Sequence, residues 1–259
     1  MKIVAILNQK GGVGKTTTAV NIAAALSIVT KKTLLIDLDS QGNASTSLGC
    51  NLSDRSFNIY KVLTGQATFA QAKFKTSIAL LDLLPANMDL AAAELEMAGL
   101  YKRDYVLKEI ISQIIEKYEY IIIDCPPALS LLSINALVAA TDVLIPMQCE
   151  FFALEGLSHL LEIIKAIKTN FNNPLNIMGV LLTMYDKRNR LTELVEKDVR
   201  SCLGNLVFKT TIPRNVKLSE APSYGKPAII YDHRCSGSLG YIYLVKEIIS
   251  KTFMERHIA

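Results

Sequence analysis

Three glycines, Gly11, Gly12 and Gly14, lie between a short apolar run and an alanine-rich segment. The apolar run, residues 2–7, is rich in Ile and Val and predicts a strand, whereas residues 15–28 have the spacing of a helix. In a strand–loop–helix unit of this kind, glycine backbones can turn consecutive N–H groups toward an anion at the positive end of the helix. The order of these three segments therefore predicts a phosphate-binding loop in an α/β fold.

The residues that follow the glycines suit a nucleoside triphosphate bound together with Mg²⁺. We expect Lys15 to reach the β- and γ-phosphates, Thr16 to bind Mg²⁺ directly through its hydroxyl, and Thr17 to hydrogen-bond the α-phosphate. An ordinary glycine turn is the weaker interpretation, because the strand and the helix both stand where the motif requires them. The expected cofactors are ATP and Mg²⁺, and the expected binding loop is Lys10, Gly11, Gly12, Val13, Gly14, Lys15, Thr16 and Thr17.

The start of this loop departs from the standard phosphate-binding motif. The motif has glycine five residues before its Gly-Lys-Thr, and this chain has Gln9 there, followed by Lys10. A second lysine is not needed to cradle phosphates. Lys10 therefore calls for a role beyond simple nucleotide binding.

The remainder of the chain alternates between strand and helix patterns, without a repeat or linker that would divide it. Further strands are expected at residues 33–37, 78–84, 120–123, 143–147, 177–183 and 206–212, and helices at residues 154–170, 191–203 and 241–253. Half of the residues are hydrophobic and a fifth are charged, as in compact α/β proteins. We therefore expect a single P-loop NTPase domain over residues 1–259, with a mostly parallel twisted sheet and helices on both of its faces.

Asp39 and Asp124 each follow a predicted strand, so both are expected at the carboxyl edge of the sheet. Asp124 comes directly after the apolar run 120–123 and can bind Mg²⁺ through water. Asp39 is our candidate for positioning the water that attacks the γ-phosphate, and it is also expected near Mg²⁺. Because aspartate is common in turns and helix caps, a capping role for Asp39 remains the alternative.

Composition argues against several other classes of protein. The five cysteines are irregularly spaced and form no Cys-x-x-Cys, unlike a disulfide framework or a zinc site. The first residues do not resemble a signal peptide. The longest apolar stretch, residues 128–147, contains Asn135, Asp142 and Pro146, and it predicts a buried helix followed by a strand instead of a membrane span. We expect a cytoplasmic protein without stable membrane binding.

Residues 8–18, with Lys10 in the anomalous position, resemble the deviant Walker A loop of the ParA/MinD superfamily of P-loop ATPases. The resemblance covers nearly the whole chain and points to the chromosomal ParA (Soj-type) branch. Ser40 departs from the pattern, because the family usually has proline there. The motifs that carry the resemblance are residues 37–43 (DLDSQGN), 124–127 (DCPP), 153–156 (ALEG), 183–186 (TMYD) and 212–223 (IPRNVKLSEAPS).

The resemblance implies how the site works. Lys10 would reach across an ATP-dependent, nucleotide-sandwich homodimer to the partner's ATP, and the catalytic residues would be Lys10, Lys15 and Asp39. Pro213 and Asn215 would line the adenine site. The chain has no Asn-Lys-x-Asp segment that would read guanine, which also favours adenine. Hydrolysis would be weak by itself and would be stimulated by a ParB-type protein.

The net charge of +4 is concentrated late in the chain, since residues 184–234 carry ten Lys and Arg against six Asp and Glu. A basic segment alone is most often solvated surface. The resemblance implies binding to double-stranded DNA without sequence preference, for which phosphate contacts are enough. The expected DNA contacts are Arg188, Arg190, Arg214 and Lys217, and the expected location is the nucleoid.

Three other functions remain as alternatives. A MinD-like membrane ATPase would share the loop but would carry a basic amphipathic helix at its C-terminus, where residues 248–259 have few basic side chains. An iron–sulfur carrier ATPase would need paired cysteines at a dimer interface, which this spacing does not provide, although Cys125 stands beside Asp124. A biosynthetic ligase would need an acceptor pocket, for which the sequence shows no residues.

Overall fold

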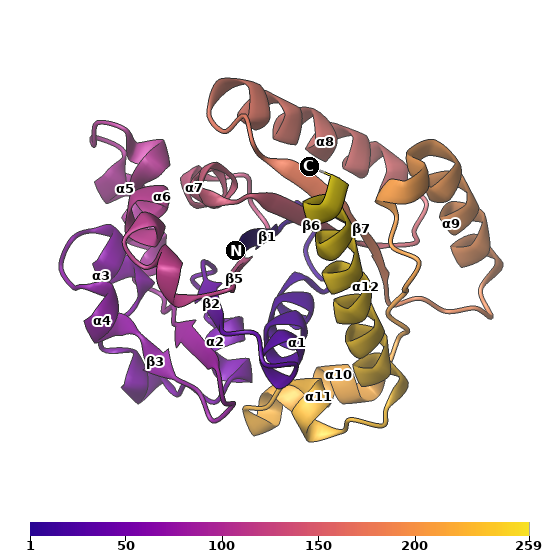
Figure 1. Cartoon of the computed structure of the whole chain (residues 1–259), viewed down its shortest axis with the longest axis horizontal. Helices are drawn as coiled ribbons and strands as arrows, with labels where there is room; N and C mark the ends of the chain where they lie inside the picture. Colours follow the sequence, from indigo (N-terminus) through magenta and orange to yellow (C-terminus); the bar gives the residue numbers. More distant parts are fainter. Residues whose placement is uncertain (259) are drawn as a thin grey trace.

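One sheet of seven strands forms the centre of the structure, a computed structural model that describes the backbone of residues 1–258 and the side chains of residues 1–253 (Figure 1). The strands are β1 (Lys2–Ile6), β2 (Thr33–Asp37), β3 (Phe74–Lys75), β4 (Leu81–Leu84), β5 (Tyr120–Asp124), β6 (Asp142–Gln148) and β7 (Asn176–Thr183). Their order across the sheet is β3-β4-β2-β5-β1-β6-β7. Every neighbouring pair is parallel except β3 and β4, so the predicted mostly parallel sheet is confirmed.

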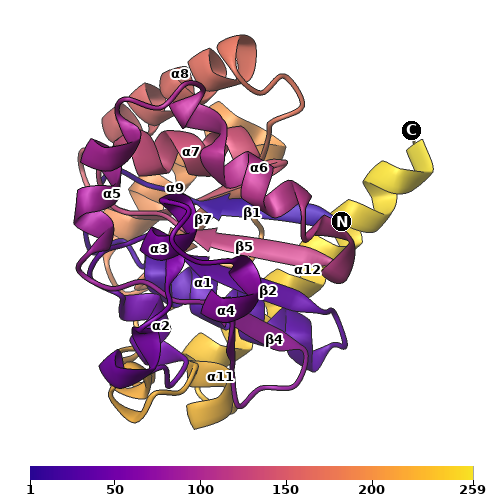
Figure 2. The same cartoon turned by 90° about the vertical axis from the view of Figure 1, so that its left-hand side faces the viewer.

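Helices cover both faces of the sheet. The α-helices are α1 (Lys15–Ile28), α2 (Asn43–Ser47), α3 (Ile59–Leu63), α4 (Phe69–Ala72), α5 (Leu90–Met97), α6 (Val106–Ser112), α7 (Leu131–Ala139), α8 (Ala153–Asn170), α9 (Arg190–Leu203), α10 (Val216–Glu220), α11 (Ala228–Tyr231) and α12 (Ser236–Ile258). Short 3₁₀ helices are η1 (Leu52–Arg55), η2 (Arg103–Tyr105), η3 (Ile115–Lys117), η4 (Gly204–Leu206) and η5 (Ala221–Tyr224). Figure 2 shows α6, α7 and α8 on one side of the strands, with α1 and α11 on the other.

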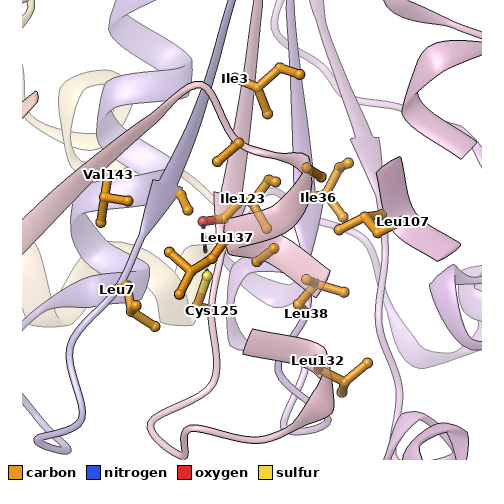
Figure 3. Packing of buried hydrophobic residues seen from close by; sticks show 14 of the residues in the cluster. Ile3, Leu7, Ile36, Leu38, Leu107, Ile123, Cys125, Leu132, Leu137 and Val143 are labelled. Atoms are coloured by element: carbon orange, nitrogen blue, oxygen red, sulfur yellow. Dashed lines mark hydrogen bonds between the residues drawn. The ribbon is translucent and has the colours of Figure 1, made fainter. Parts of the chain in front are cut away.

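The central strands are buried on both faces, because alternate side chains enter two separate apolar clusters. Around β1, Ile3 and Leu7 belong to one cluster, and Val4 and Ile6 belong to the other. Figure 3 shows the first cluster, where Leu137 of α7 packs against the sheet. Burial on both faces explains why these strands appear in the sequence as continuous apolar runs. Because β5 pairs in parallel with both β1 and β2, the carboxyl ends of these three strands lie side by side at one edge of the sheet.

Helix α1 lies against the sheet and packs along α12. Its small side chains permit this close approach, since Ala19, Ala23 and Ala24 are fully buried. The hydroxyl groups of Thr18 and Tyr241 lie 3.1 Å apart in this buried contact. Burial also raises the pKa of Tyr241. The N-terminus of α1 is therefore held firmly at the carboxyl edge of the sheet.

The predicted strand at residues 206–212 was wrong. This segment contains only an isolated bridge between Val207 and Val180, and its first residue closes η4. The backbone N–H groups of Lys209 and Thr210 donate to the carboxylate of Glu247 on α12, at 2.9 and 3.1 Å. Phe208 and Ile212 still donate to the carbonyls of Val180 and Leu182 on β7, both at 2.9 Å, so the bonds of Lys209 and Thr210 to α12 interrupt what would otherwise be a continuous strand.

The other boundary errors lie in the first half of the sheet. The predicted strand 78–84 is β4, which begins only at Leu81 because Leu80 has a positive φ of 64°. The two-residue strand β3 was not predicted at all. Residues 128–147 do form the expected helix and strand, α7 and β6.

Helix α12 includes most of the tail that was used to argue against a membrane anchor. Ile248 and Thr252 are buried, so this part of the helix packs against the body of the protein. The side chains of residues 254–259 lie outside the described residues, and the prediction for them is not addressed. Across the part of the chain that the structure describes, no helix combines the length and the apolar character needed to cross a bilayer.

Candidate functional site

The loop between β1 and α1 is held in place by the ends of β6 and β7. Gly12 and Gly14 have positive φ angles of 76° and 88°, which only glycine adopts without strain. Val13 between them is buried, and its carbonyl accepts a hydrogen bond of 2.8 Å from the Thr183 hydroxyl. The Gln148 side chain donates to the Gly12 carbonyl at 3.3 Å. The loop is therefore shaped by contacts far away in the sequence.

The two lysines of the loop point in different directions. Lys15 is 7% exposed, and its ammonium group donates to the Lys10 carbonyl at 3.0 Å, inside the curve of the loop. Burial lowers the pKa of Lys15, while the nearby carboxylates of Asp124 and Asp39 act in the opposite direction. The Lys10 side chain is exposed and forms an ion pair with Glu150, just after β6. Lys15 therefore serves the interior of the loop, and Lys10 lies on its outer surface.

Two buried carboxylates lie beside this loop, Asp37 at the end of β2 and Asp124 at the end of β5. Asp37 accepts hydrogen bonds from the Ser45 N–H and hydroxyl, at 2.8 and 2.7 Å, and from the Asp39 N–H at 3.2 Å. Burial raises the pKa of Asp37 to about 6. Burial, and then repulsion by Asp37, raise the pKa of Asp124 well above its ordinary value.

Asp124 is a buried carboxylate whose hydrogen-bonding capacity is not satisfied by the residues that the structure describes. Neither of its carboxylate oxygens has a hydrogen-bond partner of normal geometry among the described residues, although the Thr16 hydroxyl is near enough to oppose the rise in its pKa. Carboxylate and hydroxyl oxygens are the hard ligands that suit Mg²⁺. The described residues hold no group of three or more His, Cys, Asp or Glu that could bind a metal ion by themselves. A magnesium ion beside Thr16 and Asp124 would therefore share oxygens with a bound phosphate, as Mg²⁺ commonly does.

Asp39 lies in a tight turn that leads from β2 into α2. Its carboxylate accepts from the Gln41 N–H at 3.0 Å, and its carbonyl accepts from the Gly42 N–H at 2.9 Å. The residue that caps α2 is Gly42, so Asp39 does not cap this helix. One carboxylate oxygen of Asp39 orders its own turn, and this side chain affects the Lys15 ammonium electrostatically. The turn thus brings Asp39 close enough to affect Lys15, and its expected role in hydrolysis stays a prediction.

A cavity of about 190 Å³ lies beside the start of α1, and its lining includes Thr17, Thr183, Pro213 and Asn215. The Asn215 side chain caps α10 by accepting from the Lys217 N–H at 2.8 Å, and it donates to the Ser236 hydroxyl at 2.9 Å. Asn215 therefore shapes the wall of the cavity through contacts with the protein. Pro213 and Asn215 both line this cavity, and their expected contact with adenine, which the resemblance implies, stays a prediction.

The four predicted DNA contacts come from two neighbouring segments, joined by a bridge between Tyr185 and Pro213. Arg188 is held by the carboxylate of Asp186 through two hydrogen bonds, at 3.0 and 2.9 Å. Lys217 is paired with Glu220 at 2.9 Å. No ion pair is found for Arg190 or Arg214 among the side chains that the structure describes. The structure therefore brings these residues together but leaves only two of the charges free.

Sequence reasoning missed three residues of this site. Asp37 was overlooked as a separate group, although its position at a strand end next to Asp39 was a usable signal. Glu150 lies two residues after the end of β6, and Thr183 is the last residue of β7. Polar residues at the carboxyl edge of a parallel sheet are a signal of a functional site. Their partners, Lys10 and Val13, could not be read from sequence spacing.

A strand, a glycine loop and a helix, with a buried carboxylate on the adjacent strand, define the class of P-loop nucleoside triphosphatases. The family model described as an AAA domain matches residues 1–177. The chromosome partitioning protein ParA of Caulobacter vibrioides is 48% identical over 253 residues, which cover 97% of this chain and 95% of that one. The chain belongs to the ParA/MinD superfamily of P-loop ATPases, in its Soj-type chromosomal branch.

One further relative carries the name Soj, and two solved structures share the fold of this chain. The sporulation initiation inhibitor protein Soj of Bacillus subtilis is 48% identical over 247 residues, covering 95% of this chain and 98% of that one. The crystal structure of cobyrinic acid a,c-diamide synthase from Mycobacterium smegmatis, with bound ADP and magnesium, has a TM-score of 0.84 and 34% identity, covering 96% and 94% of the two chains. The cell division ATPase MinD of Pyrococcus furiosus has a TM-score of 0.80 and 26% identity, covering 97% and 99%.

Proposed function

We propose that this protein is an ATPase for DNA partitioning, in which ATP closes a homodimer, the dimer binds DNA, and hydrolysis returns it to the free chain. The observation that carries the proposal is the division of labour between two lysines in one loop. Lys15 lies inside the loop, where a phosphate binds, whereas Lys10 lies on the surface, where a second chain could be reached. The relatives named as chromosome partitioning proteins support the biological role.

The proposed nucleotide site uses the residues in the positions described above. Lys15 and the N–H groups of Gly12 to Thr16 hold the phosphates, and the cavity bounded by Pro213 and Asn215 receives the adenine. The Thr16 hydroxyl and the Asp124 carboxylate hold Mg²⁺, the latter through water. When bound, Mg²⁺ withdraws charge from the β- and γ-phosphate oxygens. The exposed edge of the site is the face that carries Lys10.

Hydrolysis is assigned to Asp39, supported by Lys10 and Lys15. Phosphoryl transfer to water needs an oriented water and stabilisation of negative charge, with little covalent chemistry. One carboxylate oxygen of Asp39 accepts a hydrogen bond from the Gln41 N–H. The other oxygen is left to accept a hydrogen bond from the attacking water. A single chain lacks the partner's Lys10, so we expect weak intrinsic turnover that a ParB-type protein stimulates.

An exposed aromatic pair supports the dimer. Phe151 and Phe152 are 77% and 72% exposed, and their rings meet edge to face with centroids 5.0 Å apart. They directly follow Glu150, the partner of Lys10. Large exposed aromatic side chains beside a charged group are typical of a surface that is covered on association. A second copy of the chain is the occupant that this proposal assigns to it.

DNA binding is assigned to Arg188, Arg190, Arg214 and Lys217 of both subunits. Two neighbouring segments supply these side chains, and a dimer would double them along one surface. Contacts of Lys and Arg with phosphates do not depend on base sequence. We expect the protein to be cytoplasmic and associated with the nucleoid.

The deciding experiment measures dimer content and binding to duplex DNA with ATP, with ADP and without nucleotide. We expect Lys10→Ala to lose ATP-dependent dimers and DNA binding, and Asp39→Ala to keep both but to lose turnover. Lys165→Ala, an exposed lysine on α8, is the matched control and should behave as the wild type. The proposal is wrong if ATP changes neither dimer content nor DNA binding and Lys10→Ala equals the wild type. ATP-dependent flotation with liposomes would instead favour a MinD-like function.

A further inference from the structure

Arg55, the last residue of η1, is a buried cation that has no carboxylate partner among the described residues. Its side chain is 3% exposed. The guanidinium donates to four neutral acceptors: the carbonyl of Cys50 at 3.2 and 2.6 Å, those of Gly42 at 3.2 Å and Ala86 at 3.1 Å, and the Thr46 hydroxyl at 2.8 Å. Each N–H of the planar group therefore has a partner.

The buried guanidinium fixes the positions of its acceptors but adds little to the free energy of unfolding. Burying a charge without an opposite charge is costly, and an apolar side chain of similar size would be cheaper to bury. Only a guanidinium can hold several acceptors in one plane, because its donors form a rigid fork. The acceptors of Arg55 lie at the start of α2, after its end, and in the segment that follows β4. Arg55 thus fixes α2 relative to the sheet.

The acceptor at Gly42 connects Arg55 to the turn that carries Asp39. The Gly42 N–H donates to the Asp39 carbonyl at 2.9 Å, while the Gly42 carbonyl accepts from Arg55. Gly42 has a positive φ of 62°, and a Cβ atom there would collide with Nη1 of Arg55. The Thr46 hydroxyl also donates to the Gly42 carbonyl, at 3.1 Å. Both backbone polar groups of Gly42 are therefore held, its N–H by Asp39 and its carbonyl by Arg55 and Thr46.

A second buried charge holds the same turn from the opposite side. Asp37 accepts from the Asp39 N–H and from Ser45, whose hydroxyl accepts in turn from the Ala86 N–H at 3.0 Å. The Ala86 carbonyl is one of the acceptors of Arg55. Asp37 and Arg55 thus both hold the turn and α2. Ala86 connects the two, because its N–H donates to Ser45, a partner of Asp37, and its carbonyl accepts from Arg55.

We propose that Arg55 is a positioning residue for ATP hydrolysis, which places the Asp39 carboxylate by holding the Gly42 carbonyl. The proposal rests on the hydrolytic role given to Asp39 above. None of the hydrogen bonds of Arg55 reaches the phosphate loop, so its loss affects the turnover step and leaves nucleotide affinity unchanged. An error of about 1 Å in a catalytic group can cost about 100-fold in rate.

The test compares Arg55→Lys with Arg103→Lys, a control at an exposed arginine away from the site. Lysine keeps the charge but has no planar fork, so it cannot satisfy the four acceptors together. Single-turnover hydrolysis of labelled ATP, binding of a fluorescent ADP analogue and thermal unfolding are measured for each. We expect Arg55→Lys to lose about 10- to 100-fold in hydrolysis rate with nucleotide affinity and folding retained. The control should match the wild type.

A double-mutant cycle with Asp39→Ala separates this proposal from the one on which it rests. If Arg55 acts through Asp39, Arg55→Lys should have no further effect on residual hydrolysis in the Asp39→Ala background. A folded Arg55→Lys with wild-type hydrolysis, or with equal losses in affinity and rate, overturns the positioning role. Wild-type hydrolysis by Asp39→Ala overturns the role of Asp39 and this inference together.

Thr46→Val decides the matter if Arg55→Lys does not fold. This change keeps the shape of the side chain but removes its hydroxyl, which links Arg55 and the Gly42 carbonyl. We expect a smaller loss of hydrolysis rate, about three- to tenfold, with unchanged ADP affinity. Unchanged hydrolysis in this variant would count against the proposal.

Discussion

Asp37 and Asp124 stand opposite each other in the register between β2 and β5, and both side chains are fully buried at the same edge of the sheet. Their environments differ sharply. Asp37 accepts three hydrogen bonds, whereas the oxygens of Asp124 have no partner of normal geometry among the described residues. Two neighbouring carboxylates in such a place repel each other, and the repulsion contributes to the raised pKa of Asp124.

Replacing Asp124 by Asn is expected to raise the free energy of unfolding of the nucleotide-free protein near neutral pH by about 1–3 kcal/mol, because a buried carboxyl with a raised pKa destabilises the folded state there whether it is ionised or must take up a proton. The sign follows from the raised pKa values. The stability contributed by protonated Asp37 is complete below its ordinary value of 3.8 and is lost as the pH rises through about 6. The wild type should therefore gain stability between about pH 7 and pH 5 from these groups, and the variant should gain less.

Urea unfolding at both pH values checks this prediction. Asp198→Asn, at an exposed position on α9, is the control and should leave the curve unchanged. A loss of stability in Asp124→Asn at neutral pH would contradict the account of Asp124 as a destabilising buried carboxyl. MgADP should stabilise this variant less than the wild type, since the variant lacks the carboxylate that is proposed to hold Mg²⁺.

Replacing Glu150 by Gln should favour ATP-dependent dimers. The ion pair with Glu150 holds Lys10 on its own chain, and the variant releases it. An exposed pair contributes less than about 1 kcal/mol, so the dimer dissociation constant should fall by about two- to fivefold. Analytical ultracentrifugation with a slowly hydrolysed ATP analogue measures it. The control is Glu162→Gln on α8; weaker dimers in Glu150→Gln would mean that Glu150 guides Lys10 to the partner.

Replacing Asn215 by Ala should weaken nucleotide binding by about tenfold, a change of about 1.4 kcal/mol. Its side chain caps α10 and holds Ser236, so its loss lets the wall of the cavity move. Isothermal titration with ADP and GDP measures the effect, and the preference for adenine should shrink. Asn189→Ala, which removes the cap of α9, is the matched control for loss of a helix cap. Equal weakening in both variants would contradict a specific role for Asn215.

Replacing Asp186 by Asn should strengthen DNA binding by freeing Arg188. The Arg188 guanidinium lowers the pKa of Asp186 to about 2, so this carboxylate is charged at neutral pH and competes with DNA phosphate. We expect about two- to fivefold tighter binding, and a slope of log K against log salt that is steeper by about one unit. Glu162→Gln gives the effect of one lost negative charge elsewhere. An identical gain in DNA affinity in both variants would mean that Arg188 does not exchange Asp186 for a DNA phosphate.

Much of the fold could be predicted from sequence because its main signals are local. The central strands are continuous apolar runs, and α1 begins directly after the glycine loop. Residues 206–212 misled the prediction because they are buried and only partly paired with β7, and the bonds to Glu247 that interrupt the pairing are distant in sequence. The two-residue strand β3 is too short to produce a pattern.

The candidate site was predictable to the extent that its residues share a motif. Lys15 was found because it follows the glycine loop, and Asp39 and Asp124 were found because they follow predicted strands, where chemistry is expected in parallel sheets. Arg55 gave no signal, because its importance arises from acceptors that come together only in the fold. The ion pair of Lys10 with Glu150 likewise joins residues whose separation in sequence is long.

The phosphate loop is tied to its surroundings by contacts within the chain. Thr183 holds the Val13 carbonyl, Gln148 holds that of Gly12, and Lys15 already rests on the carbonyl of Lys10. These contacts reduce the ordering that nucleotide entry requires, since part of the entropy of the loop is lost when the chain folds. Capture should be quick and should follow the cell's ratio of ATP to ADP. In the proposed function, the later steps, the pairing of two chains and the hydrolysis of ATP, then set the rate of the cycle.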